Sequence, residues 1–189
     1  MTDTASRGAA VRRHRSFRGW RQASAAVIAL AGVLGLATAR LFVWPAEGMP
    51  TRVGAIEMLA GPGNRLPVAL QLAREHRAPI LAVSQGRHGY GGPCPPPVPG
   101  VKLICFDPSP GNTRGEAEFA GRLAKRYHVT SLVLVTIRAQ DTRARILAGA
   151  CFGGPVYVVT APLPLRSWPY QIAYEWGALI KALLLGRAC

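Results

Sequence analysis

Four arginines stand near places where expected strands end and helices begin, at Arg65, Arg114, Arg138 and Arg143. A guanidinium binds phosphate or carboxylate through paired hydrogen bonds, and the N–H groups at a helix N-terminus favour the same charge. If these side chains lie around one crevice, they predict a site for an anionic, phosphorylated small molecule. No cluster of carboxylates suited to a metal ion and no Ser-His-Asp arrangement accompanies them, so neither chemistry is expected.

The segment N-T-R-G-E-A, residues 112–117, predicts the start of a helix. We expect Thr113 to be the N-cap and Glu116, three residues later, to be its partner in a capping box. This interpretation leaves Arg114 unassigned. Glu116 is also the candidate for a catalytic base, although capping competes for the same carboxylate.

A glycine-rich turn, A-G-P-G-N-R at residues 60–65, follows the first expected strand and can bring backbone N–H groups close to an anion. It is neither a Walker A loop nor a G-x-G-x-x-G fingerprint, and no cofactor is expected. Ser84 and Gly86 follow the second expected strand, and Thr136 ends the fourth.

Short apolar runs alternate with amphipathic stretches along most of the chain. The expected strands are residues 53–59, 78–84, 101–106, 130–136 and 154–160, and the expected helices are residues 64–76, 113–127, 140–150 and 170–185. This alternation predicts a three-layer, Rossmann-like α/β domain with a mostly parallel sheet of about five strands. Ligands of such sheets bind outside the carboxyl ends of the strands. Glu175 and Lys181 favour a sheet-covering role for the last helix over a second membrane span.

A basic leader and an apolar stretch open the chain. Residues 1–22 hold six arginines against Asp3, residues 23–39 carry no charge, and the apolar stretch continues past Arg40 to Trp44. Residues 23–44 therefore predict a single membrane-spanning signal-anchor, with the leader in the cytoplasm and the rest outside the plasma membrane. A buried helix of a soluble protein is disfavoured, because the stretch has no polar face. Cleavage after Ala39, at an A-x-A-like site, is the open alternative.

After a linker at residues 45–52, residues 53–189 form the expected extracytoplasmic domain. The formal net charge of the whole chain is +14, and residues beyond the leader contribute much of it. A basic exported domain favours membrane lipid and an anionic envelope small molecule or lipid-linked phosphate as partners. Nucleic acid is not expected, because basic patches with interleaved aromatic residues are missing.

The chain has four cysteines, an even number that outside the cytoplasm indicates disulfides with three possible pairings. The expected topology favours Cys94–Cys105 at the carboxyl edge of the sheet and Cys151–Cys189 at its amino edge. No C-x-x-C motif is present to suggest a zinc ribbon or a redox site.

Four segments in order, A-G-P-G-N-R, A-V-S-Q-G, N-T-R-G-E-A and L-V-L-V-T-I-R-A-Q-D-T-R-A, resemble the SanA/YdcF-like family of bacterial envelope proteins. The resemblance covers roughly residues 53–157, and the anchor and Y-E-W around Glu175 also fit. It implies a Rossmann-like domain linked to envelope barrier function and to wall-precursor or lipid-carrier metabolism, without an established enzymatic activity. The matching positions are Gly61, Arg65, Ser84, Gly86, Asn112, Thr113, Glu116, Thr136, Arg143 and Ala144.

Gln140 departs from the family pattern, which commonly has histidine there. Glutamine can hydrogen-bond a ligand but cannot shuttle protons, and His88 is the only plausible replacement. The expected ligand-binding set is Gly61, Arg65, Ser84, Gly86, Asn112, Thr113, Arg114, Glu116, Thr136, Gln140 and Arg143.

Three functions are compatible with these residues. The first is binding of a phosphorylated envelope metabolite. The second is a hydrolase or phosphoesterase in which Glu116 is the base, Arg114 and Arg143 stabilise charge, and Ser84 or Thr136 orients the substrate. The third is a structural envelope protein with a vestigial pocket.

Overall fold

The computed structural model describes residues 4–86, 92–184 and 189, with side chains from residue 20 onward. The chain divides into two compact units, Met1–Arg40 and Leu41–Cys189. Helix α1 (Thr4–Thr38) makes up most of the first unit. Within the described residues one stretch, Trp20–Val43, is helical, long and apolar enough to cross a membrane. Its large apolar side chains from Trp20 to Leu36 are exposed, which suits a lipid environment better than water.

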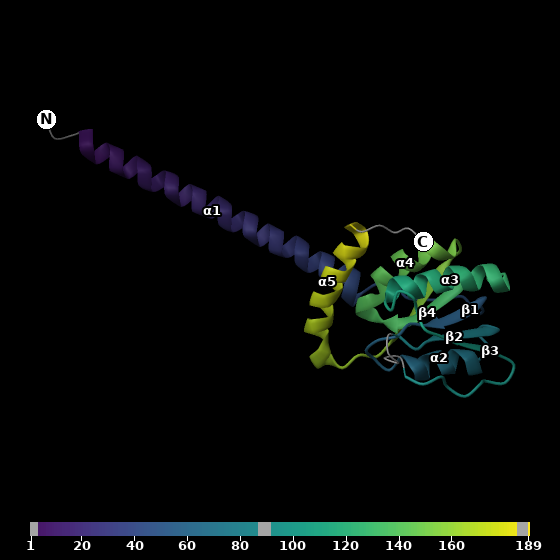
Figure 1. The fold of residues 1–189 in the computed structure, drawn as a ribbon. Helices are drawn as coiled ribbons and strands as arrows, with labels where there is room; N and C mark the ends of the chain where they lie inside the picture. Colours follow the sequence, from purple (N-terminus) through teal and green to yellow (C-terminus); the bar gives the residue numbers. More distant parts are fainter. Residues whose placement is uncertain (1–3, 87–91, 185–188) are drawn as a thin grey trace. The chain divides into compact units, whose positions relative to one another are not determined.

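The Leu41–Cys189 unit is an α/β domain built on a five-stranded, all-parallel sheet, as predicted (Figure 1). The strands are β1 (Ala55–Met58), β2 (Ile80–Ser84), β3 (Lys102–Phe106), β4 (Leu132–Ile137) and β5 (Val156–Ala161). Every residue of β1, β2 and β4 is buried, as expected for inner parallel strands covered on both faces.

The strand order is β3-β2-β1-β4-β5. The chain runs from β1 through β2 to β3 at one edge of the sheet and then crosses to β4 on the other side of β1, so the strand order switches between the neighbouring strands β1 and β4. The segments that follow these two strands turn toward opposite faces and leave a crevice at the carboxyl edge of the sheet. This is where ligands bind in doubly wound folds.

Helices cover both faces of the sheet. Helix α2 (Arg65–Arg74) lies on one face, and α3 (Thr113–Tyr127) and α4 (Asp141–Phe152) pack side by side on the other (Figure 1). The α3–α4 contact is close, because a Cβ atom at Gly121 would come within 2.7 Å of the Cys151 carbonyl oxygen.

Helix α5 (Trp168–Leu184), which follows the short η4 (Leu165–Ser167), does not cover a face of the sheet. It packs mainly against α4 and against η3 (Arg138–Gln140), the short 3-10 helix between β4 and α4. The expectation of a sheet-covering helix is therefore wrong. Its physical reason is the buried stripe of α5, in which Gln171 and Glu175 are polar and would have no partner against an apolar sheet.

Residues just after α1 are already part of the domain. The π-helix η1 (Ala39–Val43) crosses the boundary between the two units, and Phe42 is fully buried in a cluster with Ile137, Ala139 and Leu179. The Phe42 ring meets the ring of Trp176 in α5 edge-on, with 5.2 Å between centroids. Phe42 therefore attaches the chain to α5 at the last residues of the candidate span.

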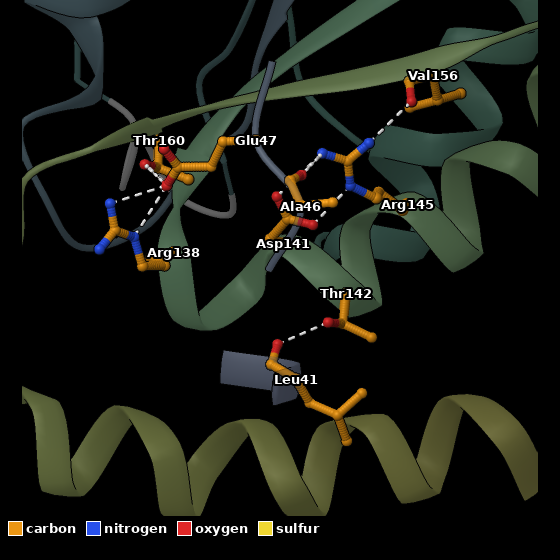
Figure 2. A network of polar contacts seen from close by, with 9 residues as sticks. All are labelled: Leu41, Ala46, Glu47, Arg138, Asp141, Thr142, Arg145, Val156 and Thr160. Carbon is orange, nitrogen blue, oxygen red and sulfur yellow. Dashed lines mark hydrogen bonds and ion pairs between the residues drawn. The ribbon is translucent and has the colours of Figure 1, made fainter. Parts of the chain in front are cut away.

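Residues 45–52, expected as a linker, are held against the domain by polar contacts (Figure 2). Arg145 donates hydrogen bonds to the Ala46 carbonyl at 2.6 Å and to Asp141 at 2.6 Å. Glu47 accepts from Arg138 at 2.9 Å and from Thr160 at 3.0 Å. Just before this segment, Thr142 donates to the Leu41 carbonyl at 2.6 Å. The chain from Leu41 to Glu47 therefore has a fixed path across the domain.

Two disulfides join Cys94 to Cys105 and Cys151 to Cys189, the pairing that the expected topology favoured. The first ties the loop after β2 to strand β3, and the second ties the end of α4 to the C-terminal residue. Disulfides persist in oxidising compartments, which agrees with a domain that lies outside the cytoplasm.

Candidate functional site

A cavity of about 490 Å³ lies at the carboxyl edge of the sheet. Its volume is within the range of about 300–1,000 Å³ that is usual for small-molecule sites. Turns after three strands, the start of α3, the start of α4 and one face of α5 surround it. The lining residues are Ala60, Gly61, Pro62, Gly86, Pro108, Gly111, Asn112, Thr113, Glu116, Gln140, Arg143, Tyr170, Gln171, Tyr174 and Glu175.

Seven residues of the expected set line this cavity: Gly61, Gly86, Asn112, Thr113, Glu116, Gln140 and Arg143. The contribution of α5 was not foreseen. Its lining residues come in two pairs one helical turn apart, Tyr170 with Tyr174 and Gln171 with Glu175. This polar stripe on an otherwise apolar helix is the signal in the sequence that points to them.

Arg65 positions the turn after β1 and does not line the cavity. It is only 2% exposed, and its guanidinium donates to the carbonyls of Leu59 at 3.0 Å, Ala60 at 2.9 Å and Pro62 at 2.9 Å. Burial lowers the pKa of Arg65 to about 10, so the side chain stays charged at neutral pH. Gly61 passes over this guanidinium at φ +131, where a Cβ atom would approach Arg65 Nη2 to 3.0 Å.

Gln140 is the centre of a buried hydrogen-bond network. Its Oε1 accepts from Arg65 Nη2 at 2.9 Å and from Thr136 Oγ1 at 2.9 Å, and its Nε2 donates to Thr113 Oγ1 at 3.0 Å. A guanidinium can only donate, which fixes the orientation of the amide. The network joins the turn after β1, the end of β4 and the start of α3. The four residues of this network, Arg65, Thr113, Thr136 and Gln140, belong to the expected ligand-binding set, and in the structure they hydrogen-bond to one another.

The expected capping box is absent from α3. Asn112 is the N-cap, and its Oδ1 accepts from the N–H groups of Arg114 at 2.9 Å and Gly115 at 3.4 Å. Thr113 is the first helical residue, and its hydroxyl is bound to Gln140. Glu116 instead accepts from the N–H of Ala60 at 2.7 Å. The box was predicted wrongly because tertiary partners take both side chains and because asparagine, one residue earlier, is an equally good cap.

Glu116 is therefore a buried carboxyl group that lines the cavity and has no capping role. Burial raises its pKa above the ordinary value, and the Ala60 N–H, the Ser84 hydroxyl and the charges of Arg65 and Arg143 act in the opposite direction. Ser84 itself is fully buried, and its Oγ is near enough to Glu116 to influence that carboxyl group although it forms no hydrogen bond of good geometry with the described residues. A carboxyl group with a raised pKa in a cavity is a candidate for proton transfer.

Arg143 lines the cavity in a two-bond ion pair with Glu175 of α5. Nε lies 2.7 Å from Oε2 and Nη2 lies 2.8 Å from Oε1, and both side chains are largely buried. Burial alone would lower the pKa of Arg143, but the hydrogen bonds and the charge of Glu175 raise it. The pair leaves Arg143 Nη1 without a hydrogen bond to any residue that the structure describes, so this nitrogen can serve a ligand.

Arg114 and Arg138 lie outside the cavity lining, and the expectation of four arginines around one crevice is wrong. Arg114 pairs with Glu118 one turn along α3 at 3.1 Å, and its side chain is 46% exposed. Arg138 pairs with Glu47 at 2.8 Å (Figure 2). Each arginine is near a helix start in the sequence, but the rotation of its helix directs the side chain elsewhere.

Glu57 is a buried carboxyl group outside the expected ligand-binding set. It lies in the central strand β1 beside a small void lined by Ala117, Ala144 and Ala148, and neither carboxyl oxygen has a hydrogen-bond partner among the described residues. Burial and then the nearby charge of Glu116 raise its pKa well above the ordinary value, which favours the protonated form. One glutamate inside the apolar run A-I-E-M-L is the signal that could have revealed it.

His88, the expected substitute for the missing histidine, lies outside the described residues. Within the described part of the chain, no three His, Cys, Asp or Glu side chains come together as a metal site. Comparisons with protein-family models, with curated proteins and with solved structures gave no match for this chain.

Proposed function

We propose that this protein is a membrane-anchored, extracytoplasmic domain that binds a phosphorylated envelope metabolite in the cavity at the carboxyl edge of its sheet. The proposal includes a retained α1 with a cytoplasmic N-terminus and membership of the SanA/YdcF-like family. A lipid-linked wall precursor or a carrier phosphate is the ligand class that fits this location. The disulfides and the candidate span support the location.

The observation that carries the proposal is the position of Arg143. It is the one expected arginine that lines the cavity, and it is fixed by Glu175 so that Nη1 remains for a ligand. The start of α3 also faces this space, and the positive end of a helix dipole favours an anion. Tyr170, Tyr174 and Gln171 supply neutral hydrogen-bonding groups for the rest of the ligand.

A test of Arg143 must take into account its ion pair with Glu175. Removing Arg143 alone would leave Glu175 buried and unpaired, which destabilises the fold for reasons unrelated to the ligand. The double variant Arg143→Gln, Glu175→Gln removes both charges and keeps hydrogen-bonding side chains. The double variant Arg138→Gln, Glu47→Gln removes an exposed pair outside the cavity lining and is the matched control.

Thermal unfolding of the full chain in nanodiscs, with and without a polyprenyl phosphate, a nucleotide sugar or inorganic phosphate, tests the proposal. A ligand at a hundred times its Kd adds about 2.7 kcal/mol to the free energy of unfolding. We expect the polyprenyl phosphate to raise the Tm of the wild type and of the control. The Arg143–Glu175 double variant should not respond. Absence of any stabilisation, or equal stabilisation of all three proteins, would contradict the proposal.

A second candidate function is hydrolysis of a phosphate ester on the same scaffold. It is favoured by Glu116, whose carboxyl group lines the cavity with a raised pKa and takes no part in capping. Glu116 would remove a proton from water as its oxygen bonds to phosphorus, the ester P–O bond would break, and the proton would pass from Glu116 to the departing alkoxide, which leaves as an alcohol. Arg143 would stabilise the charge that develops on the phosphoryl oxygens.

Glu116→Gln separates the two functions, because glutamine can still accept the hydrogen bond from the Ala60 N–H but cannot take a proton. If the hydrolase proposal holds, wild type releases phosphate from a polyprenyl phosphate, and the variant retains ligand-induced stabilisation while losing turnover. Stabilisation of the wild type without phosphate release would leave binding as the function.

A further inference from the structure

Large exposed apolar side chains in the Leu41–Cys189 unit gather in one region. Among the residues that the structure describes there, they are Trp44, Leu165, Tyr170, Tyr174, Ile180, Leu183 and Leu184. All except Trp44 lie in α5 or in η4, which directly precedes it. A soluble surface normally scatters such residues singly, and a group of them marks an interaction site.

Most of these residues in α5 lie away from its buried stripe. By helical position, Leu184, Tyr170 and Ile180 project away from Gln171, Glu175 and Leu179 and form the outer face of the helix, and Tyr174 lies at the edge of that face beside the cavity. Lys181 and, in η4, Arg166 are the exposed charges beside them, and both are cationic. A face that combines tyrosines, aliphatic side chains and lysine or arginine is typical of a helix that lies in a membrane interface.

The path of the chain indicates that lipid covers the outer face of α5. The candidate span ends at Val43, and Phe42 is already buried in the domain, with its ring against Trp176 of α5. Thr142 also holds the Leu41 carbonyl, so no free linker separates the span from the domain (Figure 2). Phe42, which contacts α5, is thus only a few residues along the chain from the exposed apolar part of the candidate span.

We infer that the outer face of α5 docks onto the surface of the bilayer, with anionic phospholipid as its partner. The inference rests on the membrane anchoring in the proposed function. It also deepens that function, because Tyr170 and Tyr174 line the cavity and belong to the docking face. The cavity then opens at the lipid surface, and its ligand is an amphiphile whose phosphorylated head enters while its chain stays in the bilayer.

Photo-crosslinking of the full chain in nanodiscs that contain phosphatidylglycerol tests this contact. A p-benzoylphenylalanine probe replaces Ile180 or Leu184 on the outer face, Gln71 on α2 or Arg122 on α3, and all four positions are exposed. A fifth probe replaces Leu30 in the candidate span and reports whether α1 is in lipid. The readout is the mass of the adduct on the probe-bearing peptide.

We expect phospholipid adducts from the probes at Ile180 and Leu184, at least tenfold more than from those at Gln71 and Arg122. Adducts at Leu30 without adducts at Ile180 and Leu184 would overturn the docking inference and leave the anchored domain intact. Equal adducts at all four domain positions, or adducts to a second copy of the chain, would also overturn it. No adduct at Leu30 would overturn both the anchoring and the docking, whereas ligand-induced stabilisation tests the cavity separately.

Discussion

The Glu116 carboxylate accepts a hydrogen bond from the backbone N–H of Ala60 at 2.7 Å, which joins the first turn of α3 to the turn after β1. These segments are 56 residues apart in the chain, and both line the cavity. The bond holds the glycine-rich turn in place and occupies one oxygen of the only carboxyl group that α3 contributes to the cavity lining. Glu116 can therefore both hold the turn after β1 in position and transfer a proton.

Glu116→Ala should lower the free energy of unfolding by about 1–3 kcal/mol, because the partly buried Ala60 N–H would lose its acceptor. Glu116→Gln should cost less, since the amide oxygen can replace Oε1. Chemical denaturation of the full chain measures both. Glu118→Ala, which removes a half-buried carboxylate that pairs with Arg114 on the same helix, is the control. Equal losses in the Ala and Gln variants would show that the Ala60 bond does not stabilise the fold.

Gln140→Ala should destabilise the protein by about 3 kcal/mol. The substitution leaves Arg65 Nη2 and the Thr113 and Thr136 hydroxyls buried without the partner they share, and each unsatisfied buried group costs about 1–3 kcal/mol. Gln140→His should recover part of the loss, because a neutral imidazole offers one donor and one acceptor.

The control for Gln140 is Gln71→Ala, which removes an exposed glutamine whose amide bonds to Glu75. Its effect should stay within about 0.5 kcal/mol, as for most surface substitutions. If Gln140→Ala were equally mild, the network would not hold the cavity floor together, and the direct ligand contact expected from the sequence would be the better account of Gln140.

The sheet was predictable because each inner strand is an apolar run bounded by turn residues, and parallel order follows from the intervening helices. The edge where ligands bind follows from that order, which is why Gly61, Thr113 and Arg143 were predicted close to where the cavity lies. Strand boundaries differ by up to two residues, with β1 beginning at Ala55 where residue 53 was expected.

The direction of individual side chains was not predictable. Arg114 and Arg143 each come shortly after a helix starts, yet one pairs with Glu118 on the surface and the other lines the cavity. The difference depends on how each helix rotates against the sheet, which only packing decides. The position of α5 was missed for a similar reason, because α2 covers one face of the sheet and α3 and α4 together cover the other.

Glu57→Gln should change how stability depends on pH. The folded-state pKa of Glu57 is raised, so between the ordinary glutamate pKa of about 4.3 and the raised value the native state holds a proton that the unfolded chain has lost. The free energy of unfolding therefore falls as pH rises through this window. Glutamine is neutral throughout and removes that contribution. Glu116, which also has a raised pKa, keeps a slope of the same sign.

Thermal unfolding of the wild type and of Glu57→Gln from pH 4 to pH 8 measures this difference. The variant should gain in Tm relative to the wild type as pH rises, and the two should converge toward pH 4. Glu75→Gln, which changes an exposed glutamate, is the control. Parallel profiles for wild type and Glu57→Gln would mean that Glu57 has no raised pKa in the folded protein.

Arg143→Ala should be the most damaging of these substitutions, with a loss of about 3–5 kcal/mol, because it leaves the Glu175 carboxylate buried without its partner. Glu175→Ala should cost a similar amount for the converse reason.

Replacing both with leucine should cost much less than the sum of the single changes, since apolar side chains of similar size often replace a buried ion pair without loss. A double-mutant cycle on the free energy of unfolding therefore gives a large coupling energy for this pair. The Arg138–Glu47 pair, exposed and at a similar distance of 2.8 Å, should give a coupling of at most about 1 kcal/mol. Similar coupling energies for the two pairs would show that Glu175 does not hold Arg143 in its place beside the cavity, and the orientation of Arg143 Nη1 toward a ligand would lose its structural basis.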